Sequence, residues 1–232
     1  MCCKYCVLEL TYILYEEYKL KKLVIIGAGE TAKIAYDYFT SDSDYEVIGF
    51  AVENEFYEIN KYIGLPVYTI EEFTNKFSKY KVDVFVAVSF IQNNEVRQRL
   101  VSYFINLGYN CASYISSKAV IHPSVKIGYN VFIFEGAVIQ IGAIVNNNTI
   151  IWNGVQICHK SIVGDNCWLA PGCVIAGLVE IGNNCFIGAN ATVIDSIKVP
   201  NKTRLGAGTV LVKNIIGNNK TYVGCPAREL CK

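Results

Sequence analysis

The second half of the chain repeats with a period of six residues. From Ile121 to Leu211, sixteen positions spaced six apart carry only isoleucine, valine or leucine. The position two residues earlier in each hexad, beginning at Ala119, always holds a small or β-branched residue. Such a hexapeptide repeat predicts a parallel β-helix, in which each hexad forms one short strand and one turn.

The same repeat predicts how each hexad is used. The large aliphatic residue points inward and the small residue lies beside it. Glycine often follows the aliphatic residue, and it allows a tight corner there; the positions are Gly128, Gly164, Gly182, Gly188 and Gly206. Three hexads make one triangular coil, so the repeat predicts about five coils, with no long insertion between them.

Strands and helices alternate in the first half of the chain. "KLVIIGAGE" predicts a buried strand that enters a glycine turn, and "TAKIAYDYF" predicts the helix that follows. "YEVIGFAV", "GLPVYT", "VDVFVAVS" and "NCASYI" continue as strands, with helices at "IEEFTNKFSKY" and "NNEVRQRLVSYFINLG". This alternation predicts a parallel sheet with crossover helices. We therefore expect a Rossmann-like domain over residues 21–117 and a β-helix domain with a C-terminal tail over residues 118–232.

The turn "GAGETA" matches the pattern G-x-G-x-x-G/A directly after a strand and at the start of a helix, through Gly27, Gly29 and Ala32. Backbone N–H groups at such a helix start can bind a phosphate. Glu53, beyond the second predicted strand, is placed to bond a ribose or sugar hydroxyl. By itself the pattern favours a dinucleotide-dependent dehydrogenase, but a β-helix follows where a hydride-transfer domain would be needed. We interpret the first domain as a nucleotide-binding module, with a purely structural turn as the alternative.

Composition limits the remaining possibilities. The net charge of +1 gives no electrostatic case for nucleic acid or an anionic membrane. The stretch from Ser196 to Lys232 is locally basic, with seven Lys or Arg against Glu229. That end is either a solvated surface or a site for a polyanion such as a nucleotide phosphate; the candidate residues are Lys198, Lys202, Arg204, Lys213 and Arg228.

The termini and the cysteines point to a reducing compartment, which we expect to be the cytoplasm. Residues 1–20 match neither a signal peptide nor a membrane span, because Lys4 and Glu9 interrupt them. This N-terminal extension is either an extra helix that packs on the first domain or a flexible tail, and we assign no role to Cys2, Cys3 and Cys6. Four cysteines lie within the hexad repeat at spacings unlike a zinc site, so we expect free thiols and no metal: Cys158, Cys167, Cys173 and Cys185.

The two halves together resemble a known family, the nucleotide-sugar acyltransferases. These join a Rossmann-like domain to a left-handed hexapeptide β-helix, and they include N-acetyltransferases for bacillosamine, perosamine and viosamine precursors and sialic-acid O-acetyltransferases. The resemblance covers about residues 21–230 and is carried by "IIGAGETAK", "VAVSFIQNNEVRQRL", "AVIHPSVKIGYNVFI", "ICHKSIVGDNCWLAPGCVIAG", "IGANATVIDSIKVPNKTRLGAGTVLVKNI" and "YVGCPAREL". It implies an α/β Rossmann-like N-terminal domain followed by a left-handed parallel β-helix, a homotrimer, and acetyl-CoA bound between neighbouring β-helices.

The resemblance also implies roles for individual residues. His159 corresponds to the general base, and Gly177 to the residue whose backbone N–H meets the thioester carbonyl. The pantetheine arm would be lined by Gly188, Ala189, Gly206 and Ala207, with Arg204 and Lys213 as candidates for the CoA phosphates. The nucleotide would be surrounded by Gly27, Gly29, Glu30, Glu53, Ser89, Asn94 and Arg97.

His159 also has the position and chemistry of a proton acceptor. It comes two residues after the inward Ile157, so it falls at a corner and projects outward, whereas a core histidine would take an inward position. Imidazole titrates close to neutral pH and suits the removal of a proton from a sugar amine. The second histidine, His122 in "IHPSV", is expected to be structural.

One residue departs from the family. An acid commonly follows the histidine and orients its ring, but Lys160 stands here, and a neighbouring ammonium would weaken the histidine as a base. Three interpretations remain: Lys160 contacts a phosphate, another carboxylate orients the ring, or the amine arrives neutral and His159 only positions the substrate.

These observations favour an acetyl-CoA-dependent N-acetyltransferase acting on a nucleotide-linked amino sugar, at the 4-amino group of a 4-amino-4,6-dideoxyhexose. The attack on the thioester would be direct, without a covalent enzyme intermediate. Acetylation of a sugar hydroxyl is the alternative within this class. An NAD-linked oxidoreductase and an inactive trimeric scaffold are the alternatives outside it.

Overall fold

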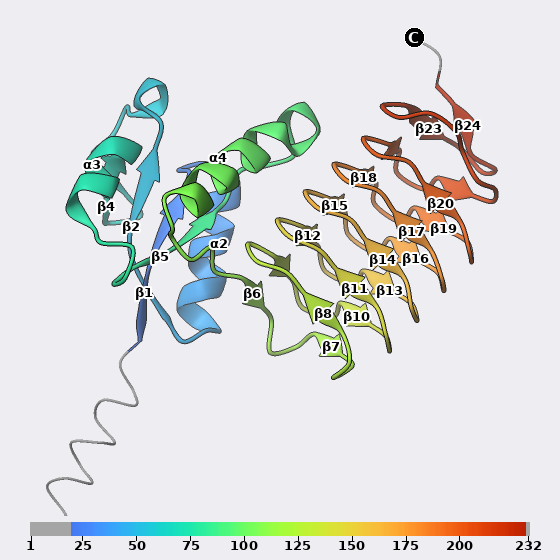
Figure 1. The fold of residues 1–232 in the computed structure, drawn as a ribbon, viewed down its shortest axis with the longest axis horizontal. Helices are drawn as coiled ribbons and strands as arrows, with labels where there is room; N and C mark the ends of the chain where they lie inside the picture. The colour runs from blue at the N-terminus through green and yellow to red at the C-terminus, as the bar shows by residue number, and fades with distance from the viewer. Residues whose placement is uncertain (1–19, 231–232) are drawn as a thin grey trace, which may run out of the picture.

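A computed structural model describes residues 20–230 of the chain (Figure 1). The predicted N-terminal extension lies outside the described residues except for Leu20, as do residues 231–232. An α/β domain lies beside a stack of short parallel strands. Buried residues of both parts form one hydrophobic cluster between them.

The N-terminal domain is a five-stranded sheet with the order β3-β4-β2-β1-β5. The strands are β1 (Lys21–Ile26), β2 (Tyr45–Val52), β3 (Lys61–Tyr62), β4 (Leu65–Thr69) and β5 (Asp83–Val86). All but β3 are parallel, as expected. The short β3 adds an antiparallel edge, because Ile63 and Gly64 both take left-handed conformations and reverse the chain in two residues.

Helices cover both faces of this sheet. The helix α2 (Glu30–Ser41) lies between the sheet and the β-helix, where Phe39 packs with Phe85 and with Phe132 of the second domain. On the other face lie α3 (Ile70–Lys76) and α4 (Glu95–Asn106), whose Phe73 and Phe104 pack on each other. A short 3-10 helix, η1 (Asn54–Phe56), follows β2, and a second one, η2 (Ile91–Asn94), precedes α4.

The second domain is the predicted left-handed β-helix, built from three parallel sheets. Sheet one contains β7 (Val120–Ile121), β10 (Val138–Ile139), β13 (Gln156–Ile157), β16 (Val174–Ile175), β19 (Thr192–Val193) and β22 (Val210–Leu211). Sheet two contains β8 (Lys126–Ile127), β11 (Ile144–Val145), β14 (Ile162–Val163), β17 (Glu180–Ile181) and β20 (Lys198–Val199). Sheet three contains β6 (Tyr114–Ile115), β9 (Phe132–Ile133), β12 (Ile150–Ile151), β15 (Trp168–Leu169), β18 (Phe186–Ile187), β21 (Arg204–Leu205), β23 (Thr221–Val223) and the antiparallel β24 (Arg228–Glu229).

From β6 to β22, the strands that pair within a sheet are eighteen residues apart, so each aliphatic position stacks on its equivalent in the next coil. Ile139 pairs with Ile157, which pairs with Ile175. All three are buried, and the smaller residues two positions earlier, such as Val155 and Cys173, are buried with them. Each coil therefore buries its neighbour's aliphatic residues, which no single hexad could do alone.

The glycines that follow the aliphatic residues have a different role from the one predicted. Gly128 and Gly188 do not take left-handed conformations; they lie where two coils approach closely. A Cβ on Gly188 would lie 2.6 Å from the backbone nitrogen of Ala207. The left-handed conformations occur two residues later instead, at Asn130 and Asn190 for example, because asparagine tolerates this region better than most residues.

The β-helix begins before residue 118, where the repeat placed its start. Tyr114 and Ile115 pair with Phe132 and Ile133 of sheet three, whereas Cys111 still bridges to β5. The segment "NCASYI" is thus divided between the two domains. Ile115 fits the hexad spacing, but it lies at the open end of the coil and stays exposed while Tyr114 is buried.

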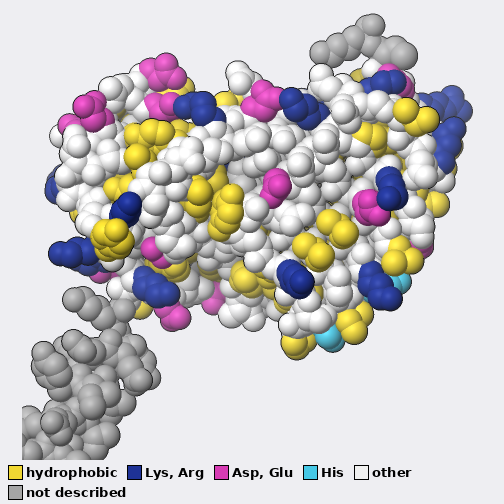
Figure 2. All heavy atoms as spheres, viewed as in Figure 1, with side chains coloured by type: hydrophobic (Ala, Val, Ile, Leu, Met, Phe, Trp, Pro, Cys, Tyr) yellow, Lys and Arg dark blue, Asp and Glu magenta, His cyan; other side chains and the backbone are white. Residues whose placement is uncertain are grey.

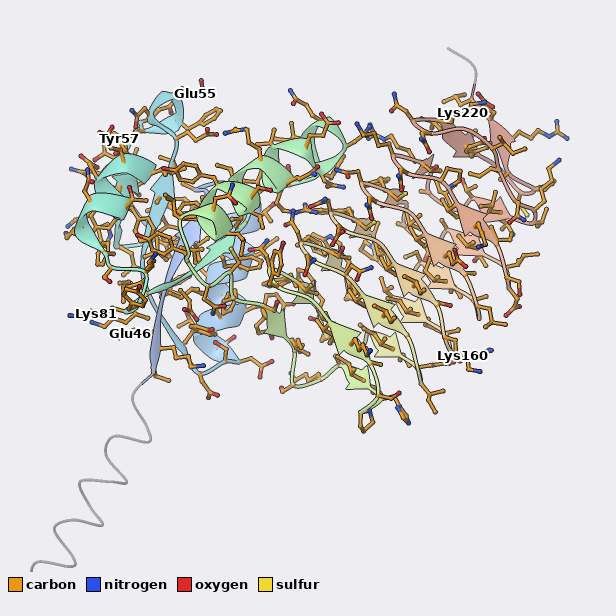
Figure 3. All side chains as sticks on the ribbon, in the orientation of Figure 1. Glu46, Glu55, Tyr57, Lys81, Lys160 and Lys220 are labelled. Atoms are coloured by element: carbon orange, nitrogen blue, oxygen red, sulfur yellow. The ribbon has the colours of Figure 1, made fainter. Side chains whose placement is uncertain are left out.

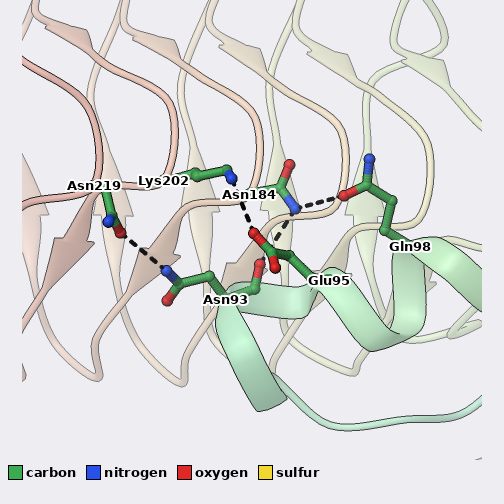
Figure 4. A network of polar contacts seen from close by, with 6 residues as sticks. All are labelled: Asn93, Glu95, Gln98, Asn184, Lys202 and Asn219. Carbon is green, nitrogen blue, oxygen red and sulfur yellow. Dashed lines mark hydrogen bonds and ion pairs between the residues drawn. The ribbon is translucent and has the colours of Figure 1, made fainter.

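Polar side chains along one corner of the β-helix join it to α4 (Figure 4). Asn184 donates to Gln98 Oε1 at 2.9 Å and to the carbonyl of Asn93 at 3.2 Å, and Lys202 forms an ion pair with Glu95 at 2.9 Å. These contacts come from successive coils and follow the N-terminal half of α4. They fix the direction of α4 relative to the coil axis.

Candidate active site

His159 lies at the corner that follows β13. Its side chain is exposed, in agreement with its place two residues after Ile157. The ring covers Gly177 of the next coil so closely that a Cβ on Gly177 would lie 2.6 Å from Nε2 and 2.9 Å from Nδ1. The backbone N–H of His159 donates to Gln140 Oε1 at 3.0 Å, which ties the corner to the preceding coil. Because Gly177 has no side chain, the imidazole of His159 has room to lie against its backbone.

The N–H of Gly177, which the resemblance predicts to meet a thioester carbonyl, has a hydrogen-bond partner within the chain. It donates to Asp195 Oδ1 at 2.9 Å. Asp195 stands eighteen residues after Gly177, so the stacking of coils places it at the same corner one coil further on. The sequence analysis did not identify Asp195. Its spacing of eighteen residues from Gly177, the same as that from His159 to Gly177, could have indicated that it lies at this corner.

Lys160, the departure from the family pattern, takes the left-handed position of this corner with φ of 56°. Its side chain is exposed and points outward from the edge of the β-helix (Figure 3). On the surface, lysine and histidine side chains lie next to exposed hydrophobic ones along this edge (Figure 2). The hydrophobic residues of the corner include Ile141, Leu178 and Ile194.

His122 has the local role expected of it. Its Nδ1 lies 2.9 Å from Ser124 Oγ, and the backbone N–H of Ser124 donates to the same ring nitrogen at 3.2 Å. These bonds close a turn within three residues, which accounts for the imidazole without a ligand.

The nucleotide candidates of the glycine turn meet at the carboxyl edge of the parallel sheet. Gly27 follows β1 with φ of 120°, and a Cβ on it would lie 3.0 Å from the carbonyl oxygen of Ala87, which follows β5. Gly29 caps α2 without a side-chain hydrogen bond, and Glu30 begins that helix in an exposed position. Ser89 lies half-buried beyond β5 at the same edge. The first-turn amides of α2 are therefore available to an anion.

Asn94 adds an unsatisfied polar group near this edge. It lies at the start of α4 in a left-handed conformation, after two other left-handed residues, Gln92 and Asn93. Its side chain is fully buried, and neither its nitrogen nor its oxygen has a hydrogen-bond partner among the described residues. Buried amides are rarely left unpaired, so Asn94 is the candidate here that a ligand would complete.

Glu53 and Arg97 are engaged within the protein. Arg99 donates to both carboxylate oxygens of Glu53, at 2.7 and 2.9 Å, and this hydrogen bonding lowers the pKa of Glu53. Glu53 opens onto a cleft of about 480 Å³ lined by Glu53, Asn54, Glu55, Ile70, Glu71, Arg99, Leu100 and Tyr103.

Arg97 is fully buried at the domain junction, which differs from the expected contact with a nucleotide. Its guanidinium donates to Asn148 Oδ1 at 3.0 Å and to the carbonyls of Val88, Asn148 and Cys167. Burial lowers its pKa. Because its hydrogen bonds reach both domains, Arg97 joins the N-terminal domain to the β-helix.

The CoA candidates lie at another corner. Gly188, Ala189, Gly206 and Ala207 follow the strands of sheet three, and Ala189 packs in the same cluster as Ala28 of the glycine turn. Arg204 lies over the ring of Phe186, 5.6 Å from its centre, and Lys213 is exposed after β22. His159 and Gly177 follow the strands of sheet one. Within one chain, sheet one separates the two corners, so the structure does not bring the proposed base and the pantetheine residues together.

Comparisons with known proteins agree with the two-domain fold. The PglD N-terminal domain model matches residues 22–104, the bacterial transferase hexapeptide model (six repeats) matches residues 160–195, and the model of the hexapeptide repeat of succinyl-transferase matches residues 178–213. The acetyltransferase domain of PglB from Neisseria gonorrhoeae FA1090 is similar at 26% identity over 90% of this chain and 100% of that one, with a TM-score of 0.81. The chain is thus an acyltransferase that resembles the nucleotide-sugar acyltransferases in both of its halves.

Two other solved structures are also similar to this acyltransferase. PerB from Caulobacter crescentus, solved with CoA and GDP-perosamine, is similar at 26% identity over 91% of this chain and 98% of that one, with a TM-score of 0.81. WeeI from Acinetobacter baumannii AYE shares the fold at 22% identity over 90% of this chain and all of that one, with a TM-score of 0.61. No curated protein sequence matches the chain.

The described residues 20–230 contain no candidate metal centre and no candidate membrane span. No group of three metal-ligating side chains gathers in this part of the acyltransferase, and none of its helices is long and apolar enough to cross a membrane. The cysteines of the β-helix are free thiols, as predicted; Cys167, Cys173 and Cys185 are buried and Cys158 is half-buried.

Proposed function

We propose that this acyltransferase moves the acetyl group of acetyl-CoA to the amine of a nucleotide-linked sugar, at the 4-amino group of a 4-amino-4,6-dideoxyhexose. The observation that carries the proposal is the imidazole of His159, exposed at a coil corner and seated on Gly177. Support comes from PerB, whose structure holds CoA and GDP-perosamine, and from the PglB acetyltransferase domain, solved with acetyl-CoA.

The complete site would form between two copies of the chain. The glycine turn and the candidate pantetheine residues lie on one side of the β-helix, where Ala28 and Ala189 share a cluster, and His159 lies at the next corner. A second copy placing its His159 corner against the first would unite these groups. Exposed hydrophobic residues at that corner, Ile141, Leu178 and Ile194, support a protein contact there. A homotrimer with three equivalent sites satisfies this arrangement.

In the reaction, the sugar amine attacks the thioester carbon directly. A C–N bond forms, the C–S bond breaks, and the sulfur of CoA leaves. His159 takes the proton that the attacking amine loses, which an imidazole does well near neutral pH. The nucleotide, held by the α2 amides behind Gly29 and by Asn94, anchors the sugar while its amine reaches the thioester.

Thiol release from acetyl-CoA tests the proposal directly. The panel contains nucleotide-linked 4-amino and 3-amino sugars with their hydroxyl analogues, and we expect turnover with one 4-amino sugar only. His159→Ala should lower kcat by about 10²-fold or more, as expected for a general base. His122→Ala is the matched control and should leave kcat unchanged. Turnover confined to a hydroxyl analogue would replace the proposal with O-acetylation, and turnover with no member of the panel would refute both.

A further inference from the structure

The corner that carries His159 forms a ladder with a period of eighteen residues. Ile141, His159, Gly177 and Asp195 occupy the same corner position in four successive coils. His159 meets Gly177 through its ring, and Asp195 meets Gly177 through a 2.9 Å hydrogen bond from the glycine N–H. The proposed base and a carboxylate thus contact the same glycine from neighbouring coils.

A second ladder contains the same kind of hydrogen bond, from a backbone N–H to a side-chain oxygen of the next coil, where it only links the coils. At the corner that faces α4, Asp165 Oδ1 accepts the N–H of Asn147 at 3.0 Å, and Asn183 and Asn201 repeat the contact in the next two coils. Here every residue is an Asx and each links one coil to the next. In the His159 ladder only Asp195 makes this contact, and it makes it to the glycine under the imidazole.

Asp195 lies at the same corner of the β-helix as His159, the proposed base. Its side chain lies at an exposed corner. Burial, and secondarily the charge of Asp195, raise the pKa of Cys158, the residue before His159. The titratable residues of the His159 corner, two coils before Asp195, are Cys158, His159 and Lys160, and none of them is a carboxylate.

We propose that Asp195 is a positioning residue that holds the Gly177 N–H in the free enzyme and yields it to the acyl carbonyl of the donor. The inference rests on the proposed function, because a thioester carbonyl is the group that would take the amide. An N–H group has one proton to donate, so the carboxylate and the carbonyl oxygen compete for it. The carboxylate is the stronger acceptor, and acetyl-CoA therefore binds against a hydrogen bond that must first break.

This competition predicts an effect that depends on the acyl group. Asp195→Ala removes the competitor, so the Kd for acetyl-CoA should fall about tenfold, the amount expected for a charge-assisted hydrogen bond at a solvent-exposed corner. The Kd for CoA should stay unchanged, because CoA has no thioester carbonyl. Asp195→Asn keeps a weaker acceptor and should lower the Kd for acetyl-CoA by about threefold. This variant also tests the inference if the alanine variant folds poorly.

The measurement is isothermal titration of the full-length protein with acetyl-CoA and with CoA. Asp165→Ala is the matched control: it removes the same bond between a carboxylate and a backbone N–H at the other corner, and both Kd values should stay at the wild-type level. Equal gains for CoA and acetyl-CoA at Asp195 would refute the inference, because they would show only the loss of a charge near an anionic ligand. Unchanged or weaker binding of acetyl-CoA would also refute it. Failure of the wild-type protein to bind acetyl-CoA would refute the proposed function, and this inference with it.

Discussion

Replacing Gly177 with alanine tests whether this glycine sets the position of His159. The backbone of Gly177 is not in the left-handed region, so alanine fits its conformation. The three atoms nearest to a Cβ there all belong to the His159 ring; they are Cε1, Nε2 at 2.6 Å and Nδ1 at 2.9 Å. Non-bonded carbon and nitrogen atoms come into contact at about 3.5 Å, so the ring must withdraw by about 1 Å.

The withdrawal should affect activity far more than stability. An exposed ring can move into solvent, so the free energy of unfolding should change by less than about 1 kcal/mol. A displacement of about 1 Å at a reacting group lowers the rate by about 10²-fold. We therefore expect Gly177→Ala to lower kcat/KM by about that factor in the thiol-release assay, with the melting temperature nearly unchanged.

A double-mutant cycle with His159→Ala isolates the cause. Once the imidazole is gone, the new methyl group has room, and Gly177→Ala should add almost nothing to the loss caused by His159→Ala. Two results would refute the reasoning. One is wild-type activity in Gly177→Ala; the other is a further large loss in the double variant, which would mean that alanine harms the site independently of the ring.

Three more predictions concern the rest of the chain. Gly27→Ala should lower the melting temperature, because φ of 120° and the Ala87 carbonyl leave no room for a Cβ, whereas Gly29→Ala meets nothing within 4 Å and should weaken nucleotide-sugar binding at an unchanged melting temperature. Arg97→Met should lower the free energy of unfolding by about 3 kcal/mol in urea titrations, because acceptors in both domains, the Val88 carbonyl in the first and Asn148 and Cys167 in the second, lose their donor. Hydrogen bonds from Tyr114 and Ser117 lower the pKa of Asp42 from 3.8 to about 2. The ionised carboxylate therefore stabilises the fold fully above pH 4, and this stabilisation disappears as the pH falls through 2. The difference in melting temperature between wild type and Asp42→Asn should shrink over that interval, and a constant difference would refute the assignment.

Local patterns in the sequence determined most of the architecture. The period of six is a property of neighbouring residues, because the inward aliphatic and the small residue belong to the same hexad, and it placed the corner of His159 outside the core. The glycine turn was equally local: Gly27 and Gly29 lie within one strand-turn-helix unit. In both cases the residues that interact are close in sequence, so spacing alone identifies them.

Only the tertiary structure decided which groups those residues meet. Asp195 contacts Gly177 because coils stack at eighteen-residue steps, and Arg97 is buried because α4 docks on the corner of Asn148. Glu53 is held by Arg99, forty-six residues away. Such contacts depend on how coils and domains pack. The secondary-structure propensity of a residue does not identify the side chain that it will contact in the folded protein. The hexad pattern therefore located the corner of the site, while the packing of the coils decided what the Gly177 amide binds.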